Sequence, residues 1–366
     1  MADLAAPSTA SRTERVLAGL RAAADASGWL PFDRFLEIAL YAPAVGYYTR
    51  PDVALGRTGD FYTAAHVGPI LARVLARRVR SDRDRFAPGG AWTVVELGPG
   101  DGRLAAGLVK ALPAGDGPVR YILVDRSPSL RAQAEARLAA ARRDAPGFTI
   151  ETAASIAEVG PLSATVLANE LLDALPFRRA VRVADGWREL GVATAGPTLA
   201  WAPGPPIAPP EGAPGFPEAE EGDVLDLPDG AQALLREVAD HLRRGTAIFL
   251  DYGDEEPQVV RPGPVGTLSA IRGHTVLAEP LHDPGTADLS AFVNFTRVRA
   301  AARRSGLAET AYGSMAQVLA DWGLADVLAE AKRAARSPEE EVRVALAGKN
   351  LAFGFSTFKV LAVGAG

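Results

Sequence analysis

The stretch Thr93–Gly102, T-V-V-E-L-G-P-G-D-G, decides the fold. Residues 93–97 are rich in β-branched side chains and stop at Gly-Pro, which predicts a short buried parallel strand. Gly98, Gly100 and Gly102 follow at alternate positions, and residues 104–112 then continue with helical spacing. A strand, a glycine turn and a helix predict a nucleotide-type site, because backbone without Cβ lets a ligand approach closely.

Two acidic residues in this stretch indicate which nucleotide binds. The dinucleotide fingerprint G-x-G-x-x-G seats a pyrophosphate on a helix N-terminus. Here the spacing is G-x-G-x-G, with Glu96 before the first glycine and Asp101 inside the loop. Carboxylates beside a pyrophosphate would repel it, whereas S-adenosyl-L-methionine (SAM) carries a sulfonium and an ammonium and no phosphate. We therefore expect Glu96, Gly98, Gly100 and Gly102 to bind SAM; an ordinary glycine-rich turn is the alternative.

A second strand is predicted at residues 121–124, ending at Asp125. In this kind of fold an acidic side chain at that position accepts hydrogen bonds from both ribose hydroxyls. We expect Asp125 and Ser127 to belong to the cofactor site. A helix cap or a solvated turn is the alternative for Asp125.

Composition excludes several classes of function. The 366 residues are 48% hydrophobic and 23% charged, with a net charge of −5, which argues against a nucleic-acid surface. The chain has no cysteine, and its four histidines form no metal-binding pattern, so we expect no metal. No apolar run reaches the roughly 18 residues of a membrane span, and residues 1–15 do not resemble a signal peptide. We expect a cytoplasmic protein with no membrane partner.

The order of elements predicts an α/β fold, a doubly wound Rossmann-like sheet with additions. We expect a helical N-terminal cap over residues 1–90, with the SAM-binding domain in 91–195 and 245–366. An insertion over 196–244 begins with a stretch so rich in Pro and Gly that we expect an exposed loop without strand pairing. Residues 246–250 are predicted as the fifth strand, and 353–363 as a closing antiparallel strand. Asp60 and Phe61 either fold over the cofactor and exclude water or belong to a local core.

Four segments carry a resemblance to a known family. They are F-L-E-I-A-L-Y-A-P-A-V-G-Y-Y (35–48), G-R-T-G-D-F-Y-T (56–63), V-V-E-L-G-P-G-D-G-R-L (94–104) and A-N-E-L-L-D-A-L-P (168–176). In this order they resemble the MidA-like methyltransferases, relatives of the mitochondrial methyltransferase that assists assembly of respiratory complex I. The resemblance implies a class I SAM-dependent methyltransferase with SAM as cofactor, acting on a protein arginine.

The last of these segments also suggests how an acceptor is held. Residues 164–167 predict a strand, and Asn169 and Glu170 lie where it ends, at the edge that faces the ligand crevice in open α/β sheets. A polar oxygen there can hold a nucleophile near the methyl group, so Asn169, Glu170 and Asp173 are the candidate catalytic residues. A helix cap followed by surface acids is the alternative.

The chain departs from the family pattern at His66, Phe292 and Asn294, on the expected substrate side. A methyltransferase for a small metabolite or natural product is therefore the leading alternative function. Two further functions are open. The chain could bind SAM and act as an assembly partner without turnover, or it could be a dehydrogenase. The sequence leaves the oligomeric state undecided, with a homodimer as one option.

Overall fold

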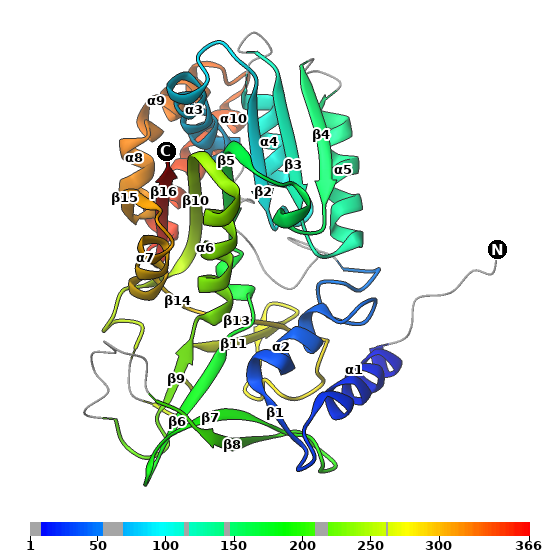
Figure 1. Ribbon diagram of the computed structural model, residues 1–366. Coiled ribbons are helices and arrows are strands. Elements are labelled where there is room, and N and C mark those ends of the chain that lie inside the picture. Colours follow the sequence, from blue (N-terminus) through cyan, green and yellow to red (C-terminus); the bar gives the residue numbers. More distant parts are fainter. Residues whose placement is uncertain (1–8, 54–68, 113–116, 143–146, 209–218, 261–262) are drawn as a thin grey trace, which may run out of the picture. The chain divides into compact units, whose positions relative to one another are not determined.

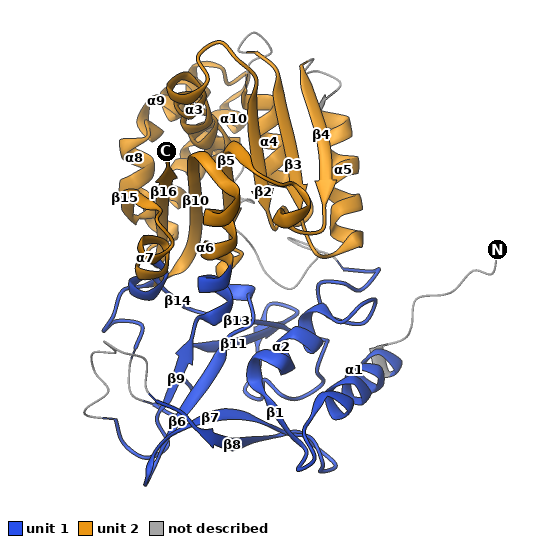
Figure 2. Ribbon diagram, viewed as in Figure 1, with its two compact units in different colours: residues 1–61, 173–233, 254–298 blue, residues 62–172, 234–253, 299–366 orange. Residues whose placement is uncertain are grey.

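The computed structural model describes residues 9–53, 69–112, 117–142, 147–208, 219–260 and 263–366. The chain divides into two compact units, each built from separate stretches of sequence (Figure 2). Unit 1 comprises residues 1–61, 173–233 and 254–298, and unit 2 comprises residues 62–172, 234–253 and 299–366. This grouping differs from the sequence expectation of a cap over 1–90 and an insertion over 196–244, since both stretches contribute to each unit.

Unit 2 contains a mainly parallel sheet with strand order β15-β16-β10-β5-β2-β3-β4 (Figure 1). Its parallel strands are β2 (Trp92–Leu97), β3 (Val119–Val124), β4 (Phe148–Ala153), β5 (Leu162–Asn169) and β10 (Leu242–Asp254). The closing strand β16 (Phe358–Ala365) is antiparallel to β10 and to β15 (Ala308–Ser314), as the sequence predicted. The direction in which successive strands are added to the sheet reverses at β2, which has β3 on one side and β5 on the other.

Both faces of this sheet are covered. On one face Val94, Tyr121 and Ile248 belong to the large apolar core, and on the other Val95 and Val166 are equally inaccessible to solvent. Strands buried on both sides are typical of doubly wound sheets and explain the apolar runs of these segments. The helices of unit 2 are α3 (Pro69–Phe86), α4 (Arg103–Ala111), α5 (Pro128–Arg142), α8 (Met315–Asp321), α9 (Leu324–Arg333) and α10 (Pro338–Lys349). The predicted doubly wound α/β fold is confirmed.

Unit 1 has two smaller antiparallel sheets. The first has the order β1-β7-β6-β9, with β8 also paired to β7; it is formed by β1 (Trp29–Pro31), β6 (Arg178–Val183), β7 (Gly186–Ala193), β8 (Ala200–Pro206) and β9 (Val224–Leu227). The second is β12 (Thr275–Val276), β11 (Leu268–Arg272) and β13 (Asp288–Ala291). The N-terminal helices α1 (Thr9–Ala23) and α2 (Phe32–Tyr41) pack with both sheets in one apolar core.

The remaining elements are short or are divided between the units. Helices α6 (Asp229–His241) and α7 (Phe295–Arg304) each have residues in both units. The short elements are β14 (Val293–Asn294), the 3₁₀ turns η4 (Ile156–Glu158) and η5 (Leu172–Ala174), and the π-helical turn η6 (Asn350–Gly354). Within the described ranges, no helix combines the length and the apolar character needed to cross a bilayer.

The expectation that the Pro/Gly-rich stretch avoids strand pairing is wrong for its first part. Residues 200–206 form β8, antiparallel to β7, with Trp201 opposite Val192 and Pro203 opposite Leu190. Proline is tolerated there because, among the described strands, β8 pairs with β7 alone, so the missing N–H groups of its prolines leave no second ladder incomplete. Likewise the N-terminal segment is not purely helical, since β1 pairs with residues 191–193.

Candidate active site

Three strand ends of unit 2 meet at one level of the sheet. Leu97, the last residue of β2, is opposite Val124 of β3 and Ala168 of β5. The next residue on each strand is therefore a predicted site residue, namely Gly98, Asp125 and Asn169. This is the carboxyl edge at which the strand order turns back, where open α/β sheets bind ligands. The structure thus brings the glycine motif, Asp125 and the Asn169–Glu170 pair to one edge.

Gly98 and Gly100 have backbone conformations that favour glycine. Their φ angles are +63° and +54°, in the left-handed region. The Gly98 N–H donates to the carbonyl of Val124 at 2.8 Å, which ties the turn to β3. A Cβ on Gly98 would lie 2.9 Å from Cδ1 of Leu171, so a larger residue would push against the segment that follows Asn169.

Gly102 has a structural task. Its φ is +78°, and a Cβ would lie 2.7 Å from Cα of Ala134 on α5. The missing side chain therefore permits close packing of the start of α4 on α5.

Glu96 is buried at the end of β2, with 2% of its surface exposed, and accepts a hydrogen bond of 2.5 Å from the Tyr121 hydroxyl. Burial raises the pKa of Glu96 to about 7; the Tyr121 bond opposes this shift and the charge of Asp101 adds to it. Glu96 is therefore neutral over part of the physiological pH range.

Asp125 is held in place by backbone donors. The Ser127 N–H donates to its Oδ1 at 2.8 Å, and the Gly100 N–H also contributes. Burial raises the pKa of Asp125 to about 6, and these donors counter the shift only in part. Ser127 itself is a helix cap, because its hydroxyl accepts from the Leu130 N–H at 3.2 Å at the start of α5.

The acidic character of the glycine loop is weaker than the sequence suggested. Asp101 is 8% exposed and forms ion pairs with Arg103 at 2.7 Å and with Arg137 at 3.0 Å. These arginines compensate its charge, so Asp101 fastens the loop to α5 and is not available to repel a phosphate. The argument from charge therefore rests on Glu96 alone, whose pKa of about 7 leaves it partly protonated at neutral pH. Sequence spacing gave no sign of the Arg137 contact.

Asn169 and Glu170 form a polar end to β5. The Asn169 side-chain N–H donates to Oε1 of Glu170 at 3.2 Å. Its Oδ1 is buried and accepts no hydrogen bond from any described residue. Glu170 has φ +51°, uncommon for a residue with a side chain, and its N–H donates to Leu250 at 2.8 Å. A buried oxygen in need of a donor beside a strained backbone is typical of a binding site.

Asp251 was missed as a site residue by the sequence analysis, although its strand was predicted. It is fully buried in β10, and its Oδ2 accepts from the N–H groups of Leu171 and Leu172 at 3.1 and 2.8 Å. Two charge-assisted bonds of this kind hold the turn that follows Glu170. The sequence around Asp251, D-Y-G, contains no signal for its contact with Leu171 and Leu172, about 80 positions earlier in the chain.

Asp173, the third candidate catalytic residue, lies in unit 1 near Asp288 and a pair of tyrosines. Tyr48 donates to Asp288 Oδ1 at 2.5 Å, and its ring stacks on Tyr41 with centroids 5.6 Å apart. Burial raises the pKa of Tyr48 far above its usual value, and the charges of Asp288, Tyr41 and Asp173 raise it further. Both carboxylates are under 10% exposed. Two motifs distant in sequence thus supply one acidic, aromatic cluster.

Of the remaining predicted residues, Asp60, Phe61 and His66 lie outside the described residues. Phe292 is 41% exposed. Asn294 is buried, and its side-chain N–H donates to Glu256 Oε1 at 2.7 Å. An aspartate in its place would face Glu256 with like charge, so this departure from the family pattern fits an internal contact.

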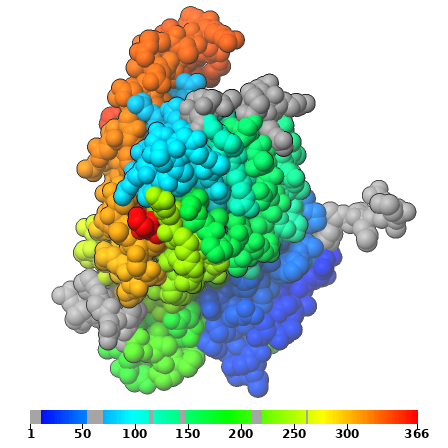
Figure 3. All heavy atoms as spheres, turned by 45° about the horizontal axis from the view of Figure 1, so that its top comes forward, coloured from blue at the N-terminus to red at the C-terminus, as the bar shows by residue number. Residues whose placement is uncertain are grey.

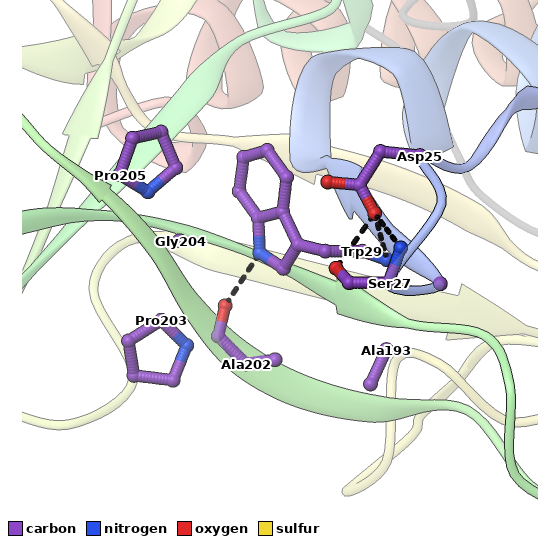
Figure 4. A pocket seen from close by; sticks show the side chains of 9 residues that line it. Asp25, Ser27, Trp29, Ala193, Ala202, Pro203, Gly204 and Pro205 are labelled. Atoms are coloured by element: carbon purple, nitrogen blue, oxygen red, sulfur yellow. Dashed lines mark hydrogen bonds between the residues drawn. The ribbon is translucent and has the colours of Figure 1, made fainter.

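A pocket of about 380 Å³ is found in unit 1, between the turn at residues 25–29 and strand β8 (Figure 4). Asp25 accepts from Ser27 and from the Trp29 N–H, and the Trp29 indole donates to Ala202 at 2.9 Å. Its polar side chains are thus engaged in holding the turn and β8. It contains none of the predicted site residues.

The edge described in unit 2 fits SAM. Gly98 and Gly100 leave room for a ligand beside the backbone, Asp125 offers an anchored carboxylate for two hydroxyls, and Asn169 offers an oxygen that lacks a donor. Among the described residues, no group of His, Cys, Asp and Glu could hold a metal ion.

Comparisons with known proteins agree with this fit. A protein family described as "Putative S-adenosyl-L-methionine-dependent methyltransferase" matches residues 70–313. A Danio rerio protein named protein arginine methyltransferase NDUFAF7, mitochondrial, is 27% identical over 326 residues, which are 80% of this chain and 73% of that protein. Its Drosophila melanogaster homologue is 28% identical over 329 residues, 78% of this chain and 70% of that protein.

A solved structure extends the similarity to the whole chain. A Burkholderia thailandensis protein, crystallised with S-adenosyl-homocysteine, has a TM-score of 0.83 and 32% identity, covering 100% of this chain and 95% of the other. The match confirms the predicted class of fold, cofactor and enzyme. The chain therefore belongs to this family of S-adenosyl-L-methionine-dependent methyltransferases.

Proposed function

We propose that this methyltransferase acts on the guanidinium of a protein arginine. The observation that carries the proposal is the polar end of β5 in unit 2, where Asn169 offers a buried Oδ1 that accepts no hydrogen bond from any described residue and Glu170 offers a carboxylate beside it. Carboxylates form the strongest hydrogen bonds to a guanidinium. The names of the relatives point to the same substrate, at 27–28% identity.

Bound SAM supplies an electrophilic methyl group, and the protein's task is to place a nitrogen in line with it. In our proposal Asn169 Oδ1 accepts a hydrogen bond from the nitrogen to be methylated. Glu170 orients the remaining N–H groups and biases the positive charge away from that nitrogen. Gly98, Gly100, Asp125 and Glu96 hold the cofactor.

The test is a tritium-transfer assay with labelled SAM on lysate separated into protein and small-molecule fractions. We expect label in protein, recovered as methylarginine after acid hydrolysis. Label confined to small molecules would support the metabolite alternative and contradict ours. Tight binding of S-adenosyl-homocysteine with no label in either fraction would support the alternative that the protein binds SAM as an assembly partner without catalysing methyl transfer.

Variants separate acceptor binding from cofactor binding. Glu170→Gln should raise the KM for the protein acceptor about tenfold or more, since it removes the charged partner of the guanidinium, with unchanged affinity for S-adenosyl-homocysteine. Glu135→Gln, the same change at an exposed glutamate on α5 of the same unit, is the matched control. Equal loss in both variants would argue against the role of Glu170.

The cytoplasmic location expected from the sequence stays a prediction, because the relatives' names place those proteins in mitochondria. Fractionation of cells that express the tagged full chain would test it.

A further inference from the structure

Helix α10 has two exposed apolar side chains on one side. Val342 and Leu346 are 57% and 52% exposed, and Phe353, in the π-helical turn that follows, is 77% exposed. The opposite face of the helix is already occupied: Ala347 and Leu351 are buried, and a Cβ on Gly348 would lie 2.8 Å from Leu328 on α9. Figure 3 shows the dark-orange stretch that contains α10 at the surface of the molecule.

This side of the helix has the spacing of a coiled-coil seam. Glu339, Val342, Leu346, Lys349 and Phe353 follow one another at intervals of three, four, three and four residues. Residues at these intervals lie on one side of a helix and pack against a second helix with the same pattern. All five are exposed, but Phe353 lies in the π-helical turn η6, whose wider turn takes it off the side of the first four. The seam therefore consists of Glu339, Val342, Leu346 and Lys349 and is open along α10.

The charges on the seam decide the direction of a partner helix. If Val342 packs against Leu346 of an antiparallel copy, the same register sets Glu339 opposite Lys349, because both pairs are centred on position 344. A parallel copy would instead set Glu339 against Glu339 and Lys349 against Lys349. Opposite charges favour the first arrangement and like charges disfavour the second.

We propose that α10 is a homodimer surface, on which a second copy of this chain docks antiparallel about a two-fold axis near residue 344. The seam is self-complementary, as a two-fold interface must be. Two Val342–Leu346 contacts between the copies supply the attraction, and two Glu339–Lys349 pairs fix the direction. This proposal is independent of the acceptor.

Light scattering during gel filtration of the full chain tests the partner. We expect a dimer that dissociates on dilution, and a monomer for Leu346→Glu that still binds S-adenosyl-homocysteine. Glu339→Lys alone should weaken the dimer about tenfold, by creating two like-charge pairs, and so should Lys349→Glu. The double variant Glu339→Lys/Lys349→Glu should restore it. Lys110→Glu, an equal charge change at an exposed site on α4, should have no effect.

Cysteine cross-linking tests the register, and the cysteine-free chain gives no background. A mixture of Glu339→Cys and Lys349→Cys should form a disulfide-linked dimer. Each variant alone should not, because its two thiols would be about 15 Å apart along the axis. A wild-type monomer at about 100 µM, no rescue by the double variant, or cross-linking of a single variant alone would each overturn the proposal.

Discussion

Asp125 changes its charge within the range of pH in which the enzyme can be handled. Its pKa is about 6, because burial outweighs the backbone donors of Ser127 and Gly100. Only the ionised carboxylate can accept hydrogen bonds from both ribose hydroxyls. We expect the dissociation constant of S-adenosyl-homocysteine to fall about tenfold as the pH rises from 5 to 7.

Isothermal titration calorimetry at several pH values measures this change. Asp125→Asn is the control, since the asparagine side chain has nearly the same shape as aspartate but does not ionise. A pH slope as steep in the variant as in the wild type would contradict the assignment.

Glu96 destabilises the folded protein at neutral pH in the free enzyme. Its pKa is about 7 when folded and 4.5 in the unfolded chain, so the unfolded state loses the proton first. The free energy of unfolding therefore falls between pH 4.5 and 7, by about 3 kcal/mol at 1.36 kcal/mol per pKa unit.

Glu96→Gln should remove this decline, so that the variant gains stability relative to wild type as the pH rises. Urea unfolding at pH 5 and 7.5 gives the comparison. Parallel pH dependence in the two proteins would show that the Glu96 carboxyl does not titrate as proposed.

At the scale of elements, the contact between α4 and α5 depends on one missing side chain. Gly102 and Gly160 have nearly equal φ angles of +78° and +76°, but only a Cβ on Gly102 meets a neighbour, Ala134. Substitution by Ala strains the backbone equally at both. We expect Gly102→Ala to cost about 1–3 kcal/mol more than Gly160→Ala, the usual effect of overpacking.

Thermal unfolding of the two variants isolates that difference, with Gly160→Ala as the matched control for backbone strain. Equal melting temperatures would mean that α5 can move aside without cost.

How far sequence predicts these elements depends on whether their contacts are local. The strand, turn and helix around Gly98 follow from patterns within ten residues, and the structure has them as predicted. β8 was missed because proline argues against a strand unless the strand lies at an edge, which only the tertiary fold decides. The tasks of Asp101 and Asp251 depend on Arg137 and Leu172, whose positions are set by other strands and helices.

At the scale of the whole molecule, the last strand is essential to unit 2. β16 lies between β10 and β15, and Val360, Leu361 and Val363 in it are almost fully buried. A stop codon after Thr357 would remove this strand and expose the edges of both neighbours. The loss should exceed the roughly 5–15 kcal/mol that stabilises a typical protein.

We expect the truncated chain to be insoluble or to lack near-ultraviolet circular dichroism, whereas a stop codon after Ala365 should leave both unchanged. A soluble, cooperatively unfolding chain that ends at Thr357 would contradict the role given to β16.

The path of the chain between the units has a practical consequence for protein engineering. The chain leaves unit 2 shortly after Glu170 and again shortly after Asp251, so two of the three segments of unit 1 begin at the ends of β5 and β10. Such junctions allow segments from a homologue to be exchanged as cassettes, with Gly98 and Asp125 left untouched. Chimaeras that exchange residues 173–233 and 254–298 for those of a homologue would replace most of unit 1 and leave the strand ends of unit 2 in place.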